Sequence, residues 1–192
     1  MSFSIDQIRA KLKPVRPTLF EVTITFNGLS TTGANGALDD FKFYCRSSSV
    51  PPSIVGQIEV PYFGRMMKIP GDRTFENWSV QVYNDENTKI RDAFETWSSL
   101  LNSMQGNYSS QARPLDLKGS ADIIQYAKTG DRSKPINQYR INGMFPVNVS
   151  EMELSWEAQG QIQLFSVSFA YDDFEVTPQR RSPNNVIGNL QN

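Results

Sequence analysis

Apolar and polar residues alternate along most of this chain, and that pattern predicts strands. In residues 18–26, Phe20 and Val22 fall on one face and Glu21 falls on the other. A period of two is typical of a strand with one buried face, because successive side chains point to opposite sides of a sheet. The same alternation recurs in residues 41–46, 56–71, 74–84, 138–157 and 161–174.

One segment changes to the period of a helix. Its apolar residues follow at spacings of four, three, four and three, which places them in one stripe: Ile90, Phe94, Trp97, Leu101 and Met104. Asn84 or Asp85 is a suitable N-cap, since a short side-chain oxygen satisfies a free backbone N–H, and Gly106 is a suitable stop. The stripe predicts a helix over residues 86–104 that lies on a sheet.

Turn residues separate these elements. Residues 27–40 concentrate Gly, Asn, Ser and Thr and are predicted to form a surface loop. Residues 56–71 are predicted to form a hairpin that turns near Gly64. Residues 121–128 fit a short strand and a helical turn equally well.

Together these elements predict a mainly β fold of the α+β kind, an antiparallel sandwich or partly open barrel with one flanking helix. Residues 18–174 are expected to form the β domain, preceded by an N-terminal arm over 1–17 and followed by a polar C-terminal extension over 175–192. The predicted core consists of Phe20, Val22, Trp78, Val80, Phe94, Trp97, Trp156, Phe165 and Phe169.

Composition narrows the possible functions. Hydrophobic residues make up 39% of the 192 positions, which is typical of a folded domain. The formal net charge is −1, so the chain lacks the overall cationic field on which nucleic-acid binding depends. Lys and Arg do alternate with aromatic residues in 41–46 and 62–68, but basic residues of this kind more often keep sheet edges soluble.

Candidate chemistry is scarce. The sequence has no histidine and a single cysteine, Cys45, so the usual general base, a disulfide and a cysteine zinc site are not available. Acidic doublets such as Asp39-Asp40 rarely converge on one atom, because neighbours on a strand point to opposite faces. We therefore expect no enzymatic activity, no metal and no cofactor.

No stretch approaches the roughly 18 apolar residues that a membrane-spanning helix needs. The charged first residues do not resemble a signal peptide either. We therefore expect no membrane insertion, and we expect synthesis in a cytoplasm.

Several short stretches occur in a specific order. They are PGDRTFENWSV from Pro70, YNDE from Tyr83 and FPVNVSEMELSW from Phe145, followed by QIQLFSVSFAYD from Gln161. In this order they resemble the tail tube proteins of contractile-tailed bacteriophages, the myoviruses, over about residues 16–174. The 27–40 loop and the segment after residue 174 look longer than in shorter members of that family.

The resemblance implies a structural virion protein. Six copies would form a ring, and rings would stack into the inner tail tube through which phage DNA is delivered without specific binding. The implied partners are the tail sheath protein, the baseplate and tail terminator proteins, and the tape-measure protein inside the tube. The alternative is the inner tube of a bacterial contractile injection apparatus, such as a type VI secretion system or a tail-like bacteriocin.

On this interpretation the sequence offers two groups of candidate residues. A conduit should not retain DNA, so acidic residues on polar strand faces are predicted to line the channel: Glu59, Glu151 and Glu153. Predicted intersubunit contacts are Arg65, Lys68, Asp72, Arg73 and Glu76. A different class, a monomeric carbohydrate-binding sandwich, would need aromatic residues exposed in a concave site, whereas the three tryptophans are predicted to be core.

Overall fold

The computed structural model describes residues 15–26, 35–109, 113–128 and 135–177. Most of the predicted N-terminal arm, part of the predicted 27–40 loop and most of the predicted C-terminal extension lie outside the described residues. The described strands are β1 (Phe20–Thr25), β2 (Cys45–Ser48), β3 (Ile54–Tyr62), β4 (Arg65–Thr74), β5 (Trp78–Tyr83), β6 (Gly119–Gln125), β7 (Asn137–Val149), β8 (Leu164–Ala170) and β9 (Asp173–Thr177). The described helices are α2 (Asn35–Tyr44), α3 (Lys89–Leu101) and the short 3-10 helix η2 (Pro114–Leu117).

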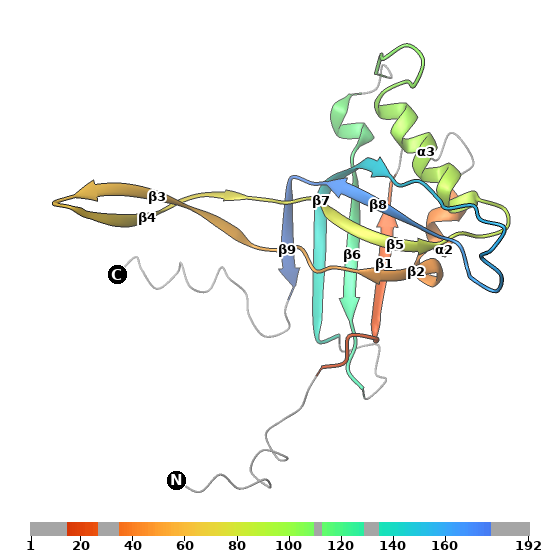
Figure 1. Cartoon of the computed structure of the whole chain (residues 1–192), viewed down its shortest axis with the longest axis horizontal. Coiled ribbons are helices and arrows are strands. Elements are labelled where there is room, and N and C mark those ends of the chain that lie inside the picture. The colour runs from red at the N-terminus through yellow and green to blue at the C-terminus, as the bar shows by residue number, and fades with distance from the viewer. Residues whose placement is uncertain (1–14, 27–34, 110–112, 129–134, 178–192) are drawn as a thin grey trace, which may run out of the picture.

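Strand β7 joins two antiparallel sheets. Its first part pairs with β6 on one side and β9 on the other, and β1 extends the sheet beyond β6. Its last part pairs with β8, which continues to β5 and β2. Gly143, with φ 64°, lies between the two parts and supplies a backbone conformation that other residues rarely adopt. In Figure 1 the strands of the second sheet cross those of the first.

The two outer strands of this path, β1 and β2, do not pair with each other, so the sheets form an open sandwich rather than a closed barrel. This confirms the predicted mainly β, antiparallel fold. The undecided segment 121–128 supplies β6, an inner strand between β1 and β7. Strand β9 continues to Thr177, three residues beyond the predicted end of the domain.

The core lies between the sheets and α3. Phe169 of β8 stands at its centre, with the rings of Trp78, Phe94 and Trp97 at 5.4, 5.6 and 6.1 Å. Both buried indoles donate a hydrogen bond, Trp78 to the carbonyl of Ser49 and Trp97 to that of Leu117, each at 2.8 Å. Of the predicted core residues, Val22, Val80, Phe165 and these four are buried, and Phe20 is half-buried.

Helix α3 is shorter than the predicted 86–104 helix at both ends. Thr88, not Asn84 or Asp85, precedes its first turn. Asn84 is engaged elsewhere, because its backbone N–H and its side-chain amide both donate to Gln163. The helix ends at Leu101, and Met104 beyond it is 78% exposed.

The prediction of a strand over residues 41–46 was wrong, because most of that segment belongs to α2. Leu38 and Phe41 are buried at a helical spacing, whereas Phe43, which a strand would place beside Phe41, is 74% exposed. The helix also takes the last residues of the predicted 27–40 loop. Two helices of the described chain therefore pack against the sandwich where the sequence predicted one.

The prediction that residues 151–157 form a strand with Trp156 in the core was also wrong. This segment has no regular structure, and Trp156 is 100% exposed. Strand β7 ends at Val149, opposite Val167 of β8, and the last hydrogen bonds between the two segments join Ser150 to Ser166. Because no described strand pairs with residues 151–157, Trp156 has no sheet face on which it could be buried.

Candidate assembly surface

The predicted hairpin is present as β3 and β4, which among the described strands pair with each other and with no other strand. They project from the sandwich as a long arm, defined here as residues 54–74 (Figure 1). None of its residues belongs to the buried core cluster. Seven large apolar side chains of the arm are between 41% and 91% exposed: Val55, Ile58, Tyr62, Phe63, Met66, Met67 and Ile69. An apolar, unpartnered ribbon of this kind marks an interaction site.

The tip of the arm contains a strained residue. Phe63 and Gly64 form the turn between the paired residues Tyr62 and Arg65, with φ of 45° and 77°. A two-residue turn with both φ values positive favours Asn-Gly, and a bulky residue at its first position costs roughly 1 kcal/mol or more. The Phe63 side chain is nevertheless 91% exposed. Sequence reasoning missed this residue, although Phe-Gly in place of Asn-Gly at a predicted hairpin turn was a signal for it.

The predicted intersubunit residues all lie on the arm or next to its base. Lys68 forms a cross-strand ion pair with Glu59 at 3.7 Å. Arg73 donates a hydrogen bond to the hydroxyl of Ser53, and not to the neighbouring carboxylates of Asp72 and Glu76. Arg65, beside the tip, forms no ion pair with any residue that the structure describes.

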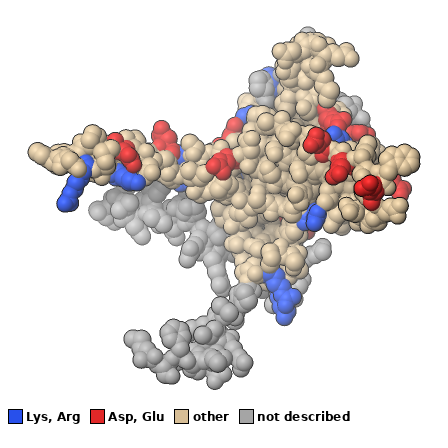
Figure 2. Space-filling view, in the orientation of Figure 1, with Lys and Arg blue, Asp and Glu red and all other residues tan. Residues whose placement is uncertain are grey.

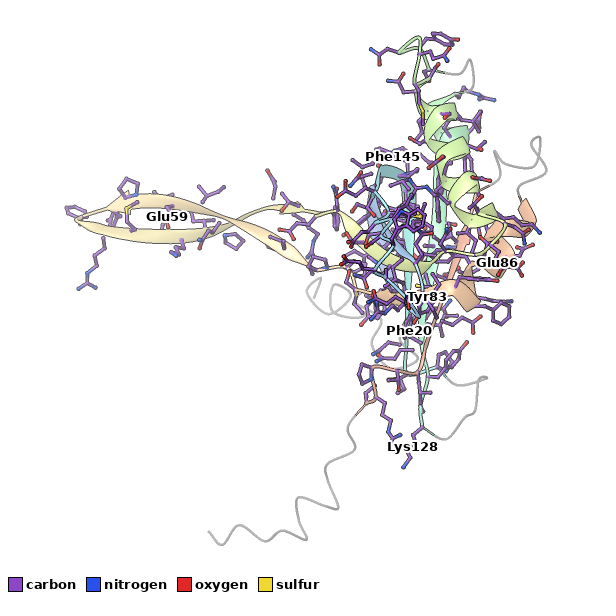
Figure 3. All side chains as sticks on the ribbon, turned by 45° about the vertical axis from the view of Figure 1, so that its right-hand side comes forward. Phe20, Glu59, Tyr83, Glu86, Lys128 and Phe145 are labelled. Carbon is purple, nitrogen blue, oxygen red and sulfur yellow. The ribbon has the colours of Figure 1, made fainter. Side chains whose placement is uncertain are left out.

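The three predicted channel residues are not brought together. Figure 3 shows Glu59 in the middle of the arm. Glu151 and Glu153 are exposed in the connection between β7 and β8, residues 151–163, which Figure 1 shows at the end of the sandwich opposite the arm. A single polar face that unites them therefore does not exist within one copy.

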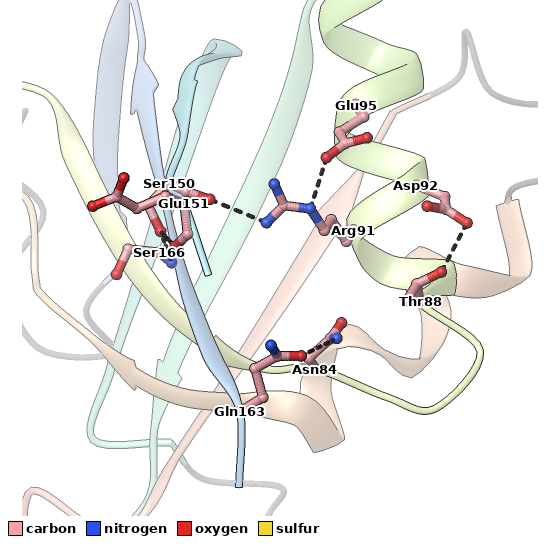
Figure 4. Close-up of polar contacts among 9 residues, drawn as sticks. All are labelled: Asn84, Thr88, Arg91, Asp92, Glu95, Ser150, Glu151, Gln163 and Ser166. Carbon is pink, nitrogen blue, oxygen red and sulfur yellow. Dashed lines mark hydrogen bonds and ion pairs between the residues drawn. The ribbon is translucent and has the colours of Figure 1, made fainter. Parts of the chain in front are cut away.

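The 151–163 connection is held at its first end by α3. Arg91 donates from Nη1 to the carbonyl of Ser150 at 3.0 Å, and its Nε pairs with Glu95 at 2.7 Å (Figure 4). Ser150 also forms two hydrogen bonds with Ser166: its backbone N–H donates to the Ser166 carbonyl, and its side-chain hydroxyl accepts from the Ser166 N–H, both at 2.8 Å.

A second pair of hydrogen bonds holds the other end of the connection. The side-chain amide of Asn84 donates to Oε1 of Gln163 at 2.8 Å, and the two residues are also joined through their backbones at 3.0 Å (Figure 4). Gln163 in turn donates from Nε2 to the carbonyl of Glu153 at 3.4 Å. Because both ends are fixed, the connection presents the exposed side chains of Leu154, Trp156 and Ile162 from a defined position.

The described residues offer little reactive chemistry. They contain no group of three or more Cys, Asp or Glu side chains placed to hold a metal ion. Burial raises the pKa of the Cys45 thiol to about 12, which makes it a poor nucleophile at neutral pH. Burial, and next the nearby carboxylate of Glu76, raise the pKa of Tyr171. Within the described residues, no helix is long and apolar enough to cross a membrane.

The described chain is thus an open sandwich from which an exposed, largely apolar arm projects. Comparison with known proteins specifies the class further. Residues 15–177 match the family described as phage tail tube protein, so the chain belongs to that family. The protein is accordingly a structural component and not an enzyme.

Curated relatives agree with this assignment. The tail tube protein gp19 of Enterobacteria phage T4 is 36% identical over 160 residues, which cover 83% of this chain and 90% of the relative. The tail tube protein of Serratia phage KSP90 is 24% identical over 152 residues, 79% of this chain and 82% of the relative.

Solved structures show the same fold at low sequence identity. A chain in the baseplate of the anti-feeding prophage has a TM-score of 0.63 at 11% identity, covering 88% of this chain and 99% of its own. A chain in the sheath-tube complex of an extracellular contractile injection system has a TM-score of 0.58 at 16% identity. The match covers 92% of this chain and 99% of that chain. The fold is thus shared with components of contractile injection systems.

Proposed function

We propose that six copies of this protein form a ring and that the rings stack into the inner tube of a contractile phage tail. The observation that carries the proposal is the arm, whose apolar side chains are exposed and belong to no buried cluster of the described residues, in a member of the phage tail tube family. A head-to-tail contact between different surfaces closes into a ring when its rotation permits, and open sheet edges allow sheets to continue between copies.

The tube is proposed to conduct phage DNA without retaining it. A near-neutral chain with net charge −1 supplies few phosphate contacts, so counterion release adds little affinity. Glu59 and Glu151 are the acidic side chains that we retain as channel-facing, whereas Glu153 lines a groove at the end of the sandwich opposite the arm. Synthesis in the host cytoplasm and incorporation into the virion follow from this role.

The other proposed partners are the sheath around the tube, the baseplate and tail terminator proteins at its ends, and the tape-measure protein inside it. The sheath and baseplate named for the structurally similar chains support this part of the proposal. The alternative, a bacterial injection apparatus, has the same fold, but the sequence relatives come from phages. Capsid and terminase genes beside this gene support the phage tail, whereas a secretion ATPase cluster supports the alternative.

Electron microscopy of the purified full chain, with light scattering on the same sample, tests the proposal. Rings or hollow tubes with sixfold symmetry are the expected result, either spontaneously or after phage baseplates are added as a template. A sample that stays monomeric in both conditions contradicts ring formation.

Arg73 is the proposed polar contact between stacked rings. Because its hydrogen bond to Ser53 lies outside the core, Arg73→Ala should weaken stacking and leave the subunit folded. Unfolding of the Arg73→Ala subunit, measured by circular dichroism, would assign the residue to the monomer instead.

A further inference from the structure

A groove of about 540 Å³ lies in the 151–163 connection, opposite the arm. Its lining combines the apolar side chains of Leu154 and Ile162 with the carboxylates of Glu153 and Glu157. Leu154 is 86% exposed and Ile162 is 66% exposed. The 151–163 connection contains three Glu and neither Lys nor Arg, so the groove is acidic, with a few apolar side chains in a mainly polar lining.

The tip of the arm has the complementary character. Tyr62, Phe63 and Met66 expose apolar surface, and Tyr62 supports the Phe63 ring edge-to-face with 4.7 Å between the centroids. Arg65 carries the positive charge, and no carboxylate in the described part of the chain pairs with it. An acidic groove with apolar side chains in its lining is complementary to a positive charge that stands next to apolar side chains.

These two surfaces cannot meet within one copy, because the arm and the 151–163 connection extend from opposite ends of the sandwich (Figure 1). Figure 2 shows basic side chains near the arm tip, with acidic side chains further along the arm, and a larger group of acidic side chains toward the end opposite the arm. A contact between different surfaces at opposite ends is head-to-tail, which is the kind that builds rings and stacked assemblies.

The conformation of Phe63 supports the same contact. A residue held in the left-handed region at a fully solvated turn has no benefit for the free subunit, and such strain is typical of functional positions. The groove is also preset, because Arg91 and Asn84 fix the two ends of the connection before any partner arrives. A preset groove loses less conformational entropy when it binds.

A second groove, of about 450 Å³, is a weaker match. Its charged lining residues are Lys42, Lys128 and Glu21, two cations against one anion. This lining repels Arg65, whereas Glu153 and Glu157 of the first groove attract it.

We propose that the arm tip of one copy docks into the 151–163 groove of a second copy, with Phe63 as the apolar anchor and Arg65 facing Glu153 and Glu157. This inference rests on the proposed self-assembly and specifies which two surfaces meet.

Cysteine cross-linking in assembled protein tests the contact. In a Cys45→Ala background, one full-length variant carries Met66→Cys on the arm and Ala158→Cys in the groove lining. A matched control carries Met66→Cys with Leu115→Cys, which is 77% exposed on η2, away from the groove. After mild oxidation, the first variant should form a ladder of covalent multimers on a non-reducing gel. The summed intensity of these bands should be at least ten times that of the control.

Phe63→Asn provides a second measurement that does not depend on cysteine chemistry. Asn suits the turn better than Phe, so this variant should fold at least as stably as the wild type while its tube formation falls at least tenfold. Wild-type tubes without the specific ladder, or normal tubes from Phe63→Asn, overturn the docking contact and leave the tube function standing. Absence of any assembly by the wild type, even on baseplates, overturns both.

Discussion

Gly119 lies where β6 begins, directly beneath the indole of Trp97. A Cβ at this position would lie 2.7 Å from the carbonyl oxygen of Thr25 and 2.7 Å from Cη2 of Trp97. Neither neighbour can yield easily, because the first is backbone and the second is a buried ring that is hydrogen-bonded to Leu117. The close approach of α3 to the first sheet thus depends on the missing side chain.

Gly119→Ala should therefore lower the free energy of unfolding by about 1–3 kcal/mol, the usual cost of overpacking a core. Gly36→Ala is the matched control, since nothing lies within 4 Å of a Cβ in that part of α2. The control should leave stability unchanged or raise it by up to about 1 kcal/mol. Urea unfolding followed by tryptophan fluorescence measures both, and equal stabilities would show that Trp97 has room to move.

Cys45 leads to a prediction about pH. Its pKa rises from 9.0 to about 12 on folding, so the unfolded chain loses the thiol proton first as pH increases. The contribution to stability is complete below pH 9 and is lost between pH 9 and about 12, by up to about 1.4 kcal/mol per pH unit.

The test compares the wild type with Cys45→Ala, which has no thiol to ionise. Lysine and tyrosine residues titrate in both proteins, so the difference between the two slopes of unfolding free energy against pH isolates the thiol. The wild type should lose stability more steeply above pH 9. Parallel slopes would mean that the thiol is hydrated in the folded protein.

Among the elements, the arm is separable from the rest of the fold. It contributes nothing to the buried core cluster, and its strands pair only with each other. Helix α3, by contrast, buries Ile90, Phe94 and Trp97 and fixes the 151–163 connection through Arg91. Stability and assembly are therefore properties of different elements.

Replacing residues 58–69 by Asn-Gly joins Gln57 to Pro70, which are paired across the arm. The free energy of unfolding of this shortened protein should lie within about 1 kcal/mol of the wild-type value, because no core side chain is removed. It should form no tubes, as judged by electron microscopy. Tubes of normal length from the shortened protein would exclude the arm from assembly.

Elements whose partners are local were predictable from the sequence. The hairpin turn at Gly64, strand β5 and the buried stripe of α3 all follow from spacing, since the period of a strand or helix depends on nearby residues. Helix α2 was missed because Phe41 and Phe43 alternate like a strand, and only packing shows that Phe43 is outside. The start of α3 was missed because Asn84 binds Gln163, which is 79 positions away.

At the scale of the whole molecule, charge is separated more than the net value of −1 suggests. The arm tip carries Arg65, and the opposite end carries Glu153 and Glu157 in a groove. Association of such ends is steered electrostatically, and salt weakens that steering.

Raising NaCl from about 0.1 M to about 1 M shortens the Debye length from about 10 Å to about 3 Å. The initial rate of tube growth, measured by light scattering, should fall several-fold over this range. Tubes of the Arg65→Glu variant should grow slowly at both salt concentrations. Adding Glu153→Arg to this variant should restore part of the growth rate. Growth that accelerates with salt would point to apolar contacts alone.

By itself the sequence determined which segments have strand or helix periodicity, that the chain folds as a mainly β domain, and that it resembles the tail tube family. These features are local, or depend on the order of residues along the chain. Only the tertiary structure decided that β7 ends at Val149 and that the alternating segment 151–157 lies outside the sheet with Trp156 exposed. The same arrangement places the arm and the groove at opposite ends. Alternation predicts which face of a segment is apolar. Which element covers that face, and whether any does, depends on pairing between strands that are distant in the sequence.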